Sequence, residues 1–595
     1  MMTWARFSQL FMGVDVPLGI KQRMTGGFYR GSRLLDPISR LMNVPLDQIN
    51  YVFSGLVALG LGCMMRRRFS PARTSPRTRA LLETIFGLFI LSFCFGNQLR
   101  VLLLQNTVAY ILMLCLPTNR VMAVLVTVWS MFYMSLVHLC RWQYDYGGYT
   151  VDISGPVMVQ TQRLSSLAFN LADGALIREH ERRKTVKRES PTSLPSDVND
   201  ITTTGLGDET ASDQAFRRSL KSSFMKRLRS FTDVQNLLPS ERAALANGGP
   251  IQAYLDRLLK GVKPSSRRSN RSDAFDSMLP SHIENAVYSV PGPIEFFSYM
   301  LYFHGACVGP FVFYSEYRSY LEGYGGKVLP PIDWRYLTTL FIRTLSSGLL
   351  SAYAAPYAPF DFVLTSSFQA WPLLKRVFYA TISLFLVRQK YYFAWGLAEV
   401  DGIGTGMGFS GYCPNTGRPR YDKVRSFDFG QVESGLSLKN AIDNWNISTT
   451  RWLRAVFYDR LPASCRTVPV FVVSAIWHGF YPGYYLMFSA FALFTLAART
   501  WHRAIRPLCR RNPWSIWLYD IFTMIATNMT INYGQAPFHL LDLSSSLIVW
   551  KAFYFIPHIV TCLILIVRFV QPRLRRSVNY GRLKSPVSLG RMVGG

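Results

Sequence analysis

Charged residues are scarce in this chain of 595 residues. They make up 17% of it, against about 25% in average soluble domains, while hydrophobic residues reach 49%. Acidic residues are the scarcer kind, with 35 Asp and Glu against 65 Lys and Arg and a formal net charge of +30. In a membrane protein such an excess lies in cytoplasmic loops and against anionic lipid head groups. A nucleic-acid partner is not expected, because no soluble domain carries a basic stripe.

Neither paired cysteines nor a cleavable leader is expected from the sequence. The nine cysteines form no CxxC pair, which argues against both a metal site and a disulfide framework. Residues 1–50 hold no clean apolar core ahead of a small-residue cleavage site, so we expect no cleavable signal peptide. The first apolar spans then serve as the targeting signal.

Apolar stretches recur along most of the chain and lack the alternation of β-barrel strands. We therefore predict an all-α fold: a polytopic bundle of about nine to eleven transmembrane spans with re-entrant or interfacial helices. The stretches cover residues 51–65, 81–96, 99–117, 120–140, 289–313, 335–358, 366–397, 463–478, 484–499, 514–533 and 545–570.

Composition divides the chain into four blocks. Residues 1–176 form an N-terminal transmembrane block, and residues 284–570 form a second one. Between them, 177–283 is basic and rich in Ser with few aromatic residues, so it cannot bury enough apolar surface to offset its ordering entropy. We expect a largely disordered loop there, either a solvated insertion or a membrane-surface or phosphoregulated segment. Residues 571–595 are a basic tail, expected in the cytoplasm.

A histidine stands between two apolar stretches. His478 directly follows the run 468–477, and the run 484–498 comes soon after it. Ionisable residues inside a membrane are costly and mark functional sites, and a low dielectric favours the neutral imidazole. A neutral imidazole can take a proton from a hydroxyl group. The alternative is a packing histidine bonded to a neighbouring carbonyl.

The stretch 445–460 holds a candidate partner for this histidine. Read as a helix, it aligns five side chains on one stripe: Asn446, Thr449, Leu453, Phe457 and Arg460. The Asn446 amide can orient the imidazole or donate a hydrogen bond to an oxyanion. Asn446-Ile447-Ser448 also matches the glycosylation sequon, but the flanking Trp445 and Trp452 indicate a buried or interfacial setting.

Four motifs follow one another in a familiar order. They are Asp152-Ile153-Ser154-Gly155-Pro156 with Gln162, Lys390-Tyr391-Tyr392-Phe393-Ala394-Trp395 with Glu399, Trp-Asn-x-x-Thr-x-x-Trp-Leu at 445–453, and Trp477-His478-Gly479-x-Tyr481-Pro482-Gly483-Tyr484. Together they resemble the lysophospholipid acyltransferase branch of the membrane-bound O-acyltransferase family. The resemblance spans about 40–176 and 284–500. The chain departs from the pattern in the insertion at 177–283 and in His304-Gly305, where relatives tend to have an apolar or proline residue.

The resemblance implies a helical bundle that encloses a catalytic tunnel, with His478 as general base and Asn446 as its partner. It assigns substrate binding to residues of the same motifs: Asp152, Gln162, Lys390, Tyr391, Glu399, Trp445, Thr449, Trp452, Trp477 and Tyr484. Acyl transfer from a thioester to an alcohol needs a base and an oxyanion donor, so we expect no metal site. Direct transfer is favoured over an acyl-enzyme, for which Ser474, one helical turn before His478, is the alternative nucleophile.

The expected function is acyl-CoA-dependent re-acylation of lysophospholipids in the endoplasmic reticulum membrane. Acyl-CoA is a co-substrate from the cytoplasmic side, the lysophospholipid arrives from the bilayer, and no cofactor is expected. Two alternatives stay open: transfer to a protein, a sterol or a diacylglycerol, and a non-catalytic membrane transporter or scaffold, which would need charges along a path. The sequence gives no prediction of oligomeric state.

Overall fold

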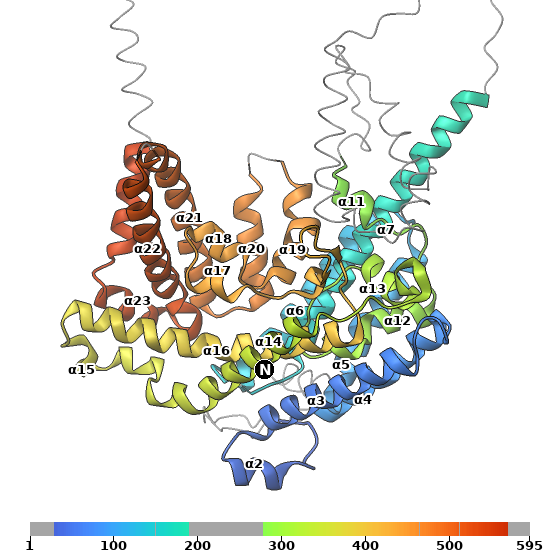
Figure 1. Cartoon of the computed structure of the whole chain (residues 1–595), viewed down its shortest axis with the longest axis horizontal. Helices are drawn as coiled ribbons and strands as arrows, with labels where there is room; N and C mark the ends of the chain where they lie inside the picture. Colours follow the sequence, from blue (N-terminus) through green and yellow to red (C-terminus); the bar gives the residue numbers. More distant parts are fainter. Residues whose placement is uncertain (1–28, 149, 190–277, 463–464, 511, 569–595) are drawn as a thin grey trace, which may run out of the picture. The chain divides into compact units, whose positions relative to one another are not determined.

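A computed structural model describes residues 29–148, 150–189, 278–462, 465–510 and 512–568, and this part of the chain is almost wholly helical (Figure 1). Its strands are β1 (Gly411–Tyr412) and β2 (Pro419–Arg420), which pair antiparallel with Gly411 opposite Arg420. The predicted all-α class is confirmed. The chain divides into a first unit (Met1–Ser347, Tyr391–Ser426, Ile447–Ala463) and a second unit (Gly348–Lys390, Phe427–Asn446, Ser464–Gly595).

The first unit contains the N-terminal helices and three later segments. Its helices are α2 (Asp36–Met42), α3 (Leu46–Arg67), α4 (Pro76–Phe95), α5 (Leu99–Cys115), α6 (Arg120–Tyr144), α7 (Ser154–Glu189), α11 (Pro280–Glu284), α12 (Pro293–Leu301), α13 (Tyr314–Glu322), most of α14 (Trp334–Leu349), the end of α16 (Leu373–Thr405) and α19 (Ile447–Val456). Short helical turns lie at Gly96–Gln98, Phe303–Gly305, Gly323–Lys327, Asp422–Val424 and Tyr458–Arg460.

The second unit holds the remaining helices. These are α15 (Ser366–Gln369), the start of α16, α17 (Phe429–Glu433), α18 (Leu438–Asp443), α20 (Thr467–His478), α21 (Pro482–Cys509), α22 (Pro513–Leu540) and α23 (Leu543–Ala552), with short turns at Leu350–Ala354, Ala355–Tyr357 and Phe360–Leu364. A last helix, Ile556–Arg568, follows α23 at a bend of 79°. The second unit also contains a charged cluster around a buried arginine. Arg388 forms a bidentate ion pair with Glu433 and donates to Asn532 Oδ1 at 2.6 Å.

Side-chain caps explain where several helices begin. The Ser75 hydroxyl accepts from Thr78 N ahead of α4, whose first residue is proline. The Asn119 side chain accepts from two backbone N–H groups at the start of α6, and Asn512 caps α22 ahead of Pro513. Each cap satisfies donors that the first helical turn would leave without a partner.

Polarity in the first unit is arranged as lipid requires. Large apolar side chains such as Leu81, Ile85 and Phe89 of α4 are exposed, at 44%, 56% and 57%. Polar side chains lie inside: Gln105 of α5 donates to Thr161 of α7 at 3.0 Å and is buried. This is the reverse of a soluble protein and the expected arrangement when hydrocarbon is the solvent.

Fewer helices are long and apolar enough to cross a membrane than the nine to eleven spans predicted from the sequence. Within the described residues three helical stretches qualify, Leu46–Arg67, Pro76–Cys115 and Arg120–Tyr144, and the bent pair that starts with α23 would be a fourth. The long helices α7 and α16 are not among them; they carry buried charged side chains such as Arg163 and Arg388, as helices enclosed by protein can. The count of nine to eleven spans stays a prediction.

The boundary predicted at residue 177 is wrong, because α7 continues without a break to Glu189. At the other end, residues 280–284 form α11. The predicted 177–283 loop is therefore shorter at both ends than its composition indicated. The rest of it, 190–277, and the predicted tail at 571–595 lie outside the described residues.

His304, where the chain departs from the family pattern, is buried in the first unit. Its Nε2 lies 3.4 Å from Glu83 Oε1, and its Nδ1 lies 3.4 Å from the Thr405 hydroxyl. The Tyr320 hydroxyl donates to the same Glu83 oxygen at 2.8 Å. These groups belong to the interior of the bundle and meet none of the predicted catalytic residues in the contacts described.

Candidate active site

His478 is the last residue of α20, and the residue after it explains why the helix stops there. Gly479 has φ +124°, a conformation that side chains with a Cβ rarely adopt. Its N–H donates to the carbonyls of Ala475 and Ile476, both at 3.1 Å, and so caps the helix. The His-Gly pair thereby places the imidazole at the carboxyl end of a short apolar helix.

Aromatic rings surround this imidazole. Ring centroids of Trp477, Tyr484, Phe488 and Phe538 lie 4.7, 5.9, 5.4 and 5.1 Å from that of His478. Trp477 and Tyr484, which the resemblance assigns to substrate binding, thus lie beside the histidine. His478 itself is half-buried, whereas Ser474 one turn earlier is buried. The imidazole is held among aromatic rings and stays partly exposed.

The rings of Tyr484 and Phe538 come from two helices whose backbones approach closely, α21 and α22. Gly483 N donates to Leu541 O at 2.7 Å, and a Cβ on Gly483 would lie 2.0 Å from the carbonyl oxygen of Pro537. The start of α21 therefore packs tightly against the end of α22, side by side in Figure 1. This contact brings the rings of Tyr484 and Phe538 together, with centroids 4.6 Å apart and planes tilted by 33°. Neither Phe488 nor Phe538 was predicted from the sequence. Helical spacing from Tyr484 could have indicated Phe488, which lies one turn further along α21, but no local pattern could have indicated Phe538.

Asn446 lies in front of α19 and not within it, so the helix predicted from this residue is wrong at its first position. Its φ is +50°, a left-handed conformation that asparagine tolerates better than most residues. The helix begins at Ile447, whose N–H donates to Ser426 O at 2.7 Å. The predicted stripe is also displaced: the buried residues are Ser448, Thr449, Trp452 and Val456. The bulk of Trp452, which is fully buried, decides which face turns inward.

Residues 449–460, which include most of α19, run parallel to α7 with a constant offset in residue number. Three side-chain contacts join residues that are each 287 positions apart: Gln162 donates to Thr449 at 2.9 Å, Trp452 donates to Ser165 at 2.8 Å, and Arg460 donates to both oxygens of Asp173 at 2.9 and 2.6 Å. A fixed offset means that the two segments advance together in the same direction. The predicted residues Gln162, Thr449 and Trp452 thus form one interface.

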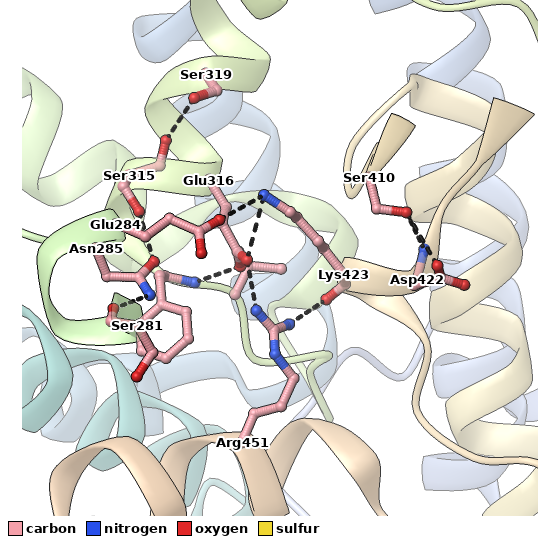
Figure 2. A network of polar contacts seen from close by, with 12 residues as sticks. Ser281, Glu284, Asn285, Ser315, Glu316, Ser319, Ser410, Asp422, Lys423 and Arg451 are labelled. Carbon is pink, nitrogen blue, oxygen red and sulfur yellow. Dashed lines mark hydrogen bonds and ion pairs between the residues drawn. The ribbon is translucent and has the colours of Figure 1, made fainter. Parts of the chain in front are cut away.

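A charged network holds the outer side of α19 (Figure 2). Arg451 donates to Glu316 of α13 and to the Lys423 carbonyl at 2.8 Å. Lys423 Nζ lies 3.7 Å from Glu316 and 3.9 Å from Glu284. The second Glu316 oxygen accepts from Phe313 N at 3.0 Å. The sequence gave no signal for this network, which fixes α19 to α13 and to the loop after β2.

The carboxylates of two further predicted residues, Asp152 and Glu399, form hydrogen bonds of their own. Asp152 accepts from Arg141 at 2.6 Å and from Ser154 N, and so fixes the entry into α7. Glu399 accepts from Tyr336 at 3.1 Å and from Ser426 N, next to the segment that receives Ile447. Their carboxylates have structural partners.

The remaining predicted residues lie on other parts of α16 and before α19. Tyr391 packs against Trp395 at 5.8 Å, and Lys390 is half-buried on the same helix. Trp445 is half-buried in the segment that follows α18 in the sequence. Asn446 and His478 both belong to the second unit, and their pairing stays a prediction. Among the described residues no group of three His, Cys, Asp or Glu side chains could hold a metal ion.

Comparison with known proteins places these elements in context. The sequence profile of MBOAT, the membrane-bound O-acyltransferase family, matches residues 138–534. The chain is 30% identical to a chicken protein named membrane-bound glycerophospholipid O-acyltransferase 2, over 90% of this chain and 88% of that one. It is 28% identical to the human protein of that name, over 93% and 91%. It is 26% identical to lysophospholipid acyltransferase 6 of Drosophila melanogaster, over 93% and 66%.

Proposed function

Because the chain belongs to the membrane-bound O-acyltransferase family, we propose that it transfers the acyl group of acyl-CoA to the free hydroxyl of a lysophospholipid. The names of its relatives support a glycerophospholipid as the acceptor. The observation that carries the chemistry is the half-buried imidazole of His478 within its cluster of rings. We further infer that the enzyme lies in the endoplasmic reticulum membrane, which tagging of the full chain in cells would test.

The proposed reaction is a direct transfer. His478 takes the proton of the lysophospholipid hydroxyl, and the oxygen attacks the thioester carbonyl carbon. The Asn446 amide donates to the developing oxyanion or holds the imidazole in place. The carbon–sulfur bond then breaks, the acyl ester stays on the lipid, and the CoA sulfur leaves and recovers the proton. Rings around His478 exclude water that would otherwise hydrolyse the thioester.

The charged network and the contacts with α7 support Asn446 indirectly. Arg451, Thr449 and Trp452 fix α19 from two sides, and Asn446 precedes that helix directly. Catalysis by proximity tolerates little misplacement, since about 1 Å can cost on the order of 100-fold in rate. These residues position the helix and need not touch a substrate.

The decisive experiment supplies purified full-length protein in lipid with labelled acyl-CoA and a panel of acceptors. The panel contains lysophospholipids of different head groups, a sterol, a diacylglycerol and a peptide, with His478→Ala as the matched control. We expect labelled diacyl phospholipid from at least one lysophospholipid and none from the variant. Product on the sterol, diacylglycerol or peptide alone would replace the proposed acceptor. Equal product from both proteins would remove His478 from the mechanism.

A further inference from the structure

Helix α21 ends in a regular row of arginines. Arg499, Arg503, Arg506 and Arg510 follow one another at steps of four, three and four residues, the last directly after the helix. Such steps place side chains on one face of a helix, which we call the arginine face. The row lies beyond the apolar part of α21 that carries Tyr484 and Phe488.

In the described part of the chain, the four arginines of this face outnumber the one carboxylate that acts near them, Asp520 of α22. None of its four arginines forms an ion pair there, and Arg506 Nε is buried without a hydrogen-bond partner. Like charges at this spacing repel one another and weaken a helix. Burial, together with the charges of Arg506 and Arg510, lowers the pKa of His502, and Asp520 opposes this shift.

A further arginine and two tryptophans lie near the end of α21 and the start of α22. Arg568 donates to the Thr500 hydroxyl at 3.2 Å and adds a further positive charge. Trp514 and Trp517, at the start of α22, are 72% and 55% exposed. Tryptophan gathers where a membrane protein crosses from hydrocarbon to head groups, so these rings indicate the depth at which the arginines lie.

We propose that the arginine face binds the head groups of anionic phospholipids. Guanidinium groups form paired hydrogen bonds with phosphate, and the exposed tryptophans beside them suit a lipid whose chains stay in the bilayer. Phosphate oxygens would add the counter-charge that Asp520 alone does not supply, and would accept a hydrogen bond from Arg506 Nε. The site is separate from the catalytic cluster and does not depend on the identity of the acyl acceptor.

The test uses purified full-length protein in detergent, titrated with short-chain phosphatidylserine or phosphatidylcholine. The variant Arg503→Gln with Arg510→Gln removes two exposed charges of the face without touching its packed members. The control, Arg182→Gln with Arg183→Gln, removes the same charge from exposed arginines that are already paired with Glu179. Each basic side chain near an anionic surface contributes about fivefold in affinity, so the variant should lose on the order of 25-fold for phosphatidylserine.

Salt and a soluble anion complete the test. High salt should weaken phosphatidylserine binding by the wild type and the control, because screening shortens the reach of exposed charges to about 3 Å at 1 M. The proposal fails if the wild type binds both lipids equally, or if the variant and the control lose affinity alike. It also fails if the variant instead raises the KM for acyl-CoA in discs of phosphatidylcholine alone, because the face would then bind the soluble phosphates of the donor.

Discussion

The left-handed backbone of Asn446 allows its side chain and its conformation to be tested separately. At φ +50° an alanine carries a steric cost of about 1–2 kcal/mol, whereas glycine adopts this region freely. Asn446→Ala should therefore lower both stability and turnover, and Asn446→Gly should lower turnover alone. If the amide acts on the oxyanion or the imidazole, both variants should lose about 100-fold or more in turnover. Asn446→Asp keeps the backbone preference and removes the amide donor, and should be as inactive as the glycine variant.

The assay is acyl transfer by purified variants in lipid, with thermal unfolding measured on the same preparations. Ser448→Ala serves as the control, since it removes the sequon and leaves Asn446 in place; we expect turnover near wild type. An Asn446→Gly protein that keeps more than about a tenth of wild-type turnover would remove the amide from the mechanism. If only the alanine variant lost activity, Asn446 would matter for its backbone and not for catalysis.

Three further predictions concern His478, the charged network of α19 and residues 190–277. His478→Ala should lose about 100-fold or more in turnover with an unchanged unfolding temperature; retention of more than about a tenth of the activity, measured with labelled acyl-CoA, would identify a packing histidine. Arg451→Met and Glu316→Gln should each destabilise the protein by about 1–3 kcal/mol, and the double variant should lose less than the sum because neither member of this ion pair is then left without the other; strictly additive unfolding free energies would contradict this coupling. Replacing residues 190–277 with a Gly/Ser linker should leave turnover close to wild type, because their composition cannot support a packed core; a folded but inactive chimera would show that the segment takes part.

Local patterns predicted the parts of the site that lie close together in sequence. His478 was predicted from its place between two apolar runs, and Trp477 and Tyr484 were predicted from the motif around it that resembles the family. The three lie close in sequence, on either side of one turn between two helices. The left-handed backbone of Asn446 and the displaced buried stripe were missed, because a periodic pattern does not show where a helix begins. The buried side of α19 depends on what Trp452 meets on α7, which is tertiary information.

Long-range partners were beyond the reach of sequence reasoning for a related cause. Phe538, Glu316 and Lys423 come from separate elements, and ordinary composition surrounds each of them. The continuation of α7 to Glu189 was missed for the opposite reason, since charged residues there resembled a solvated loop although helical pairing supports them. Arg182 and Arg183 bond Glu179 one turn earlier, a spacing that stabilises an exposed helix.

Because α7 and the 449–460 segment meet at one constant offset, the number of residues between their contacts is constrained in both segments. A single residue added between Gln162 and Asp173 would rotate every later side chain of α7 by about 100°. The Asp173 contact with Arg460 would then be lost even though every original side chain remained present. These two short segments therefore tolerate substitutions far better than insertions or deletions, and an indel scan across them should find activity abolished where nearby conservative replacements are silent.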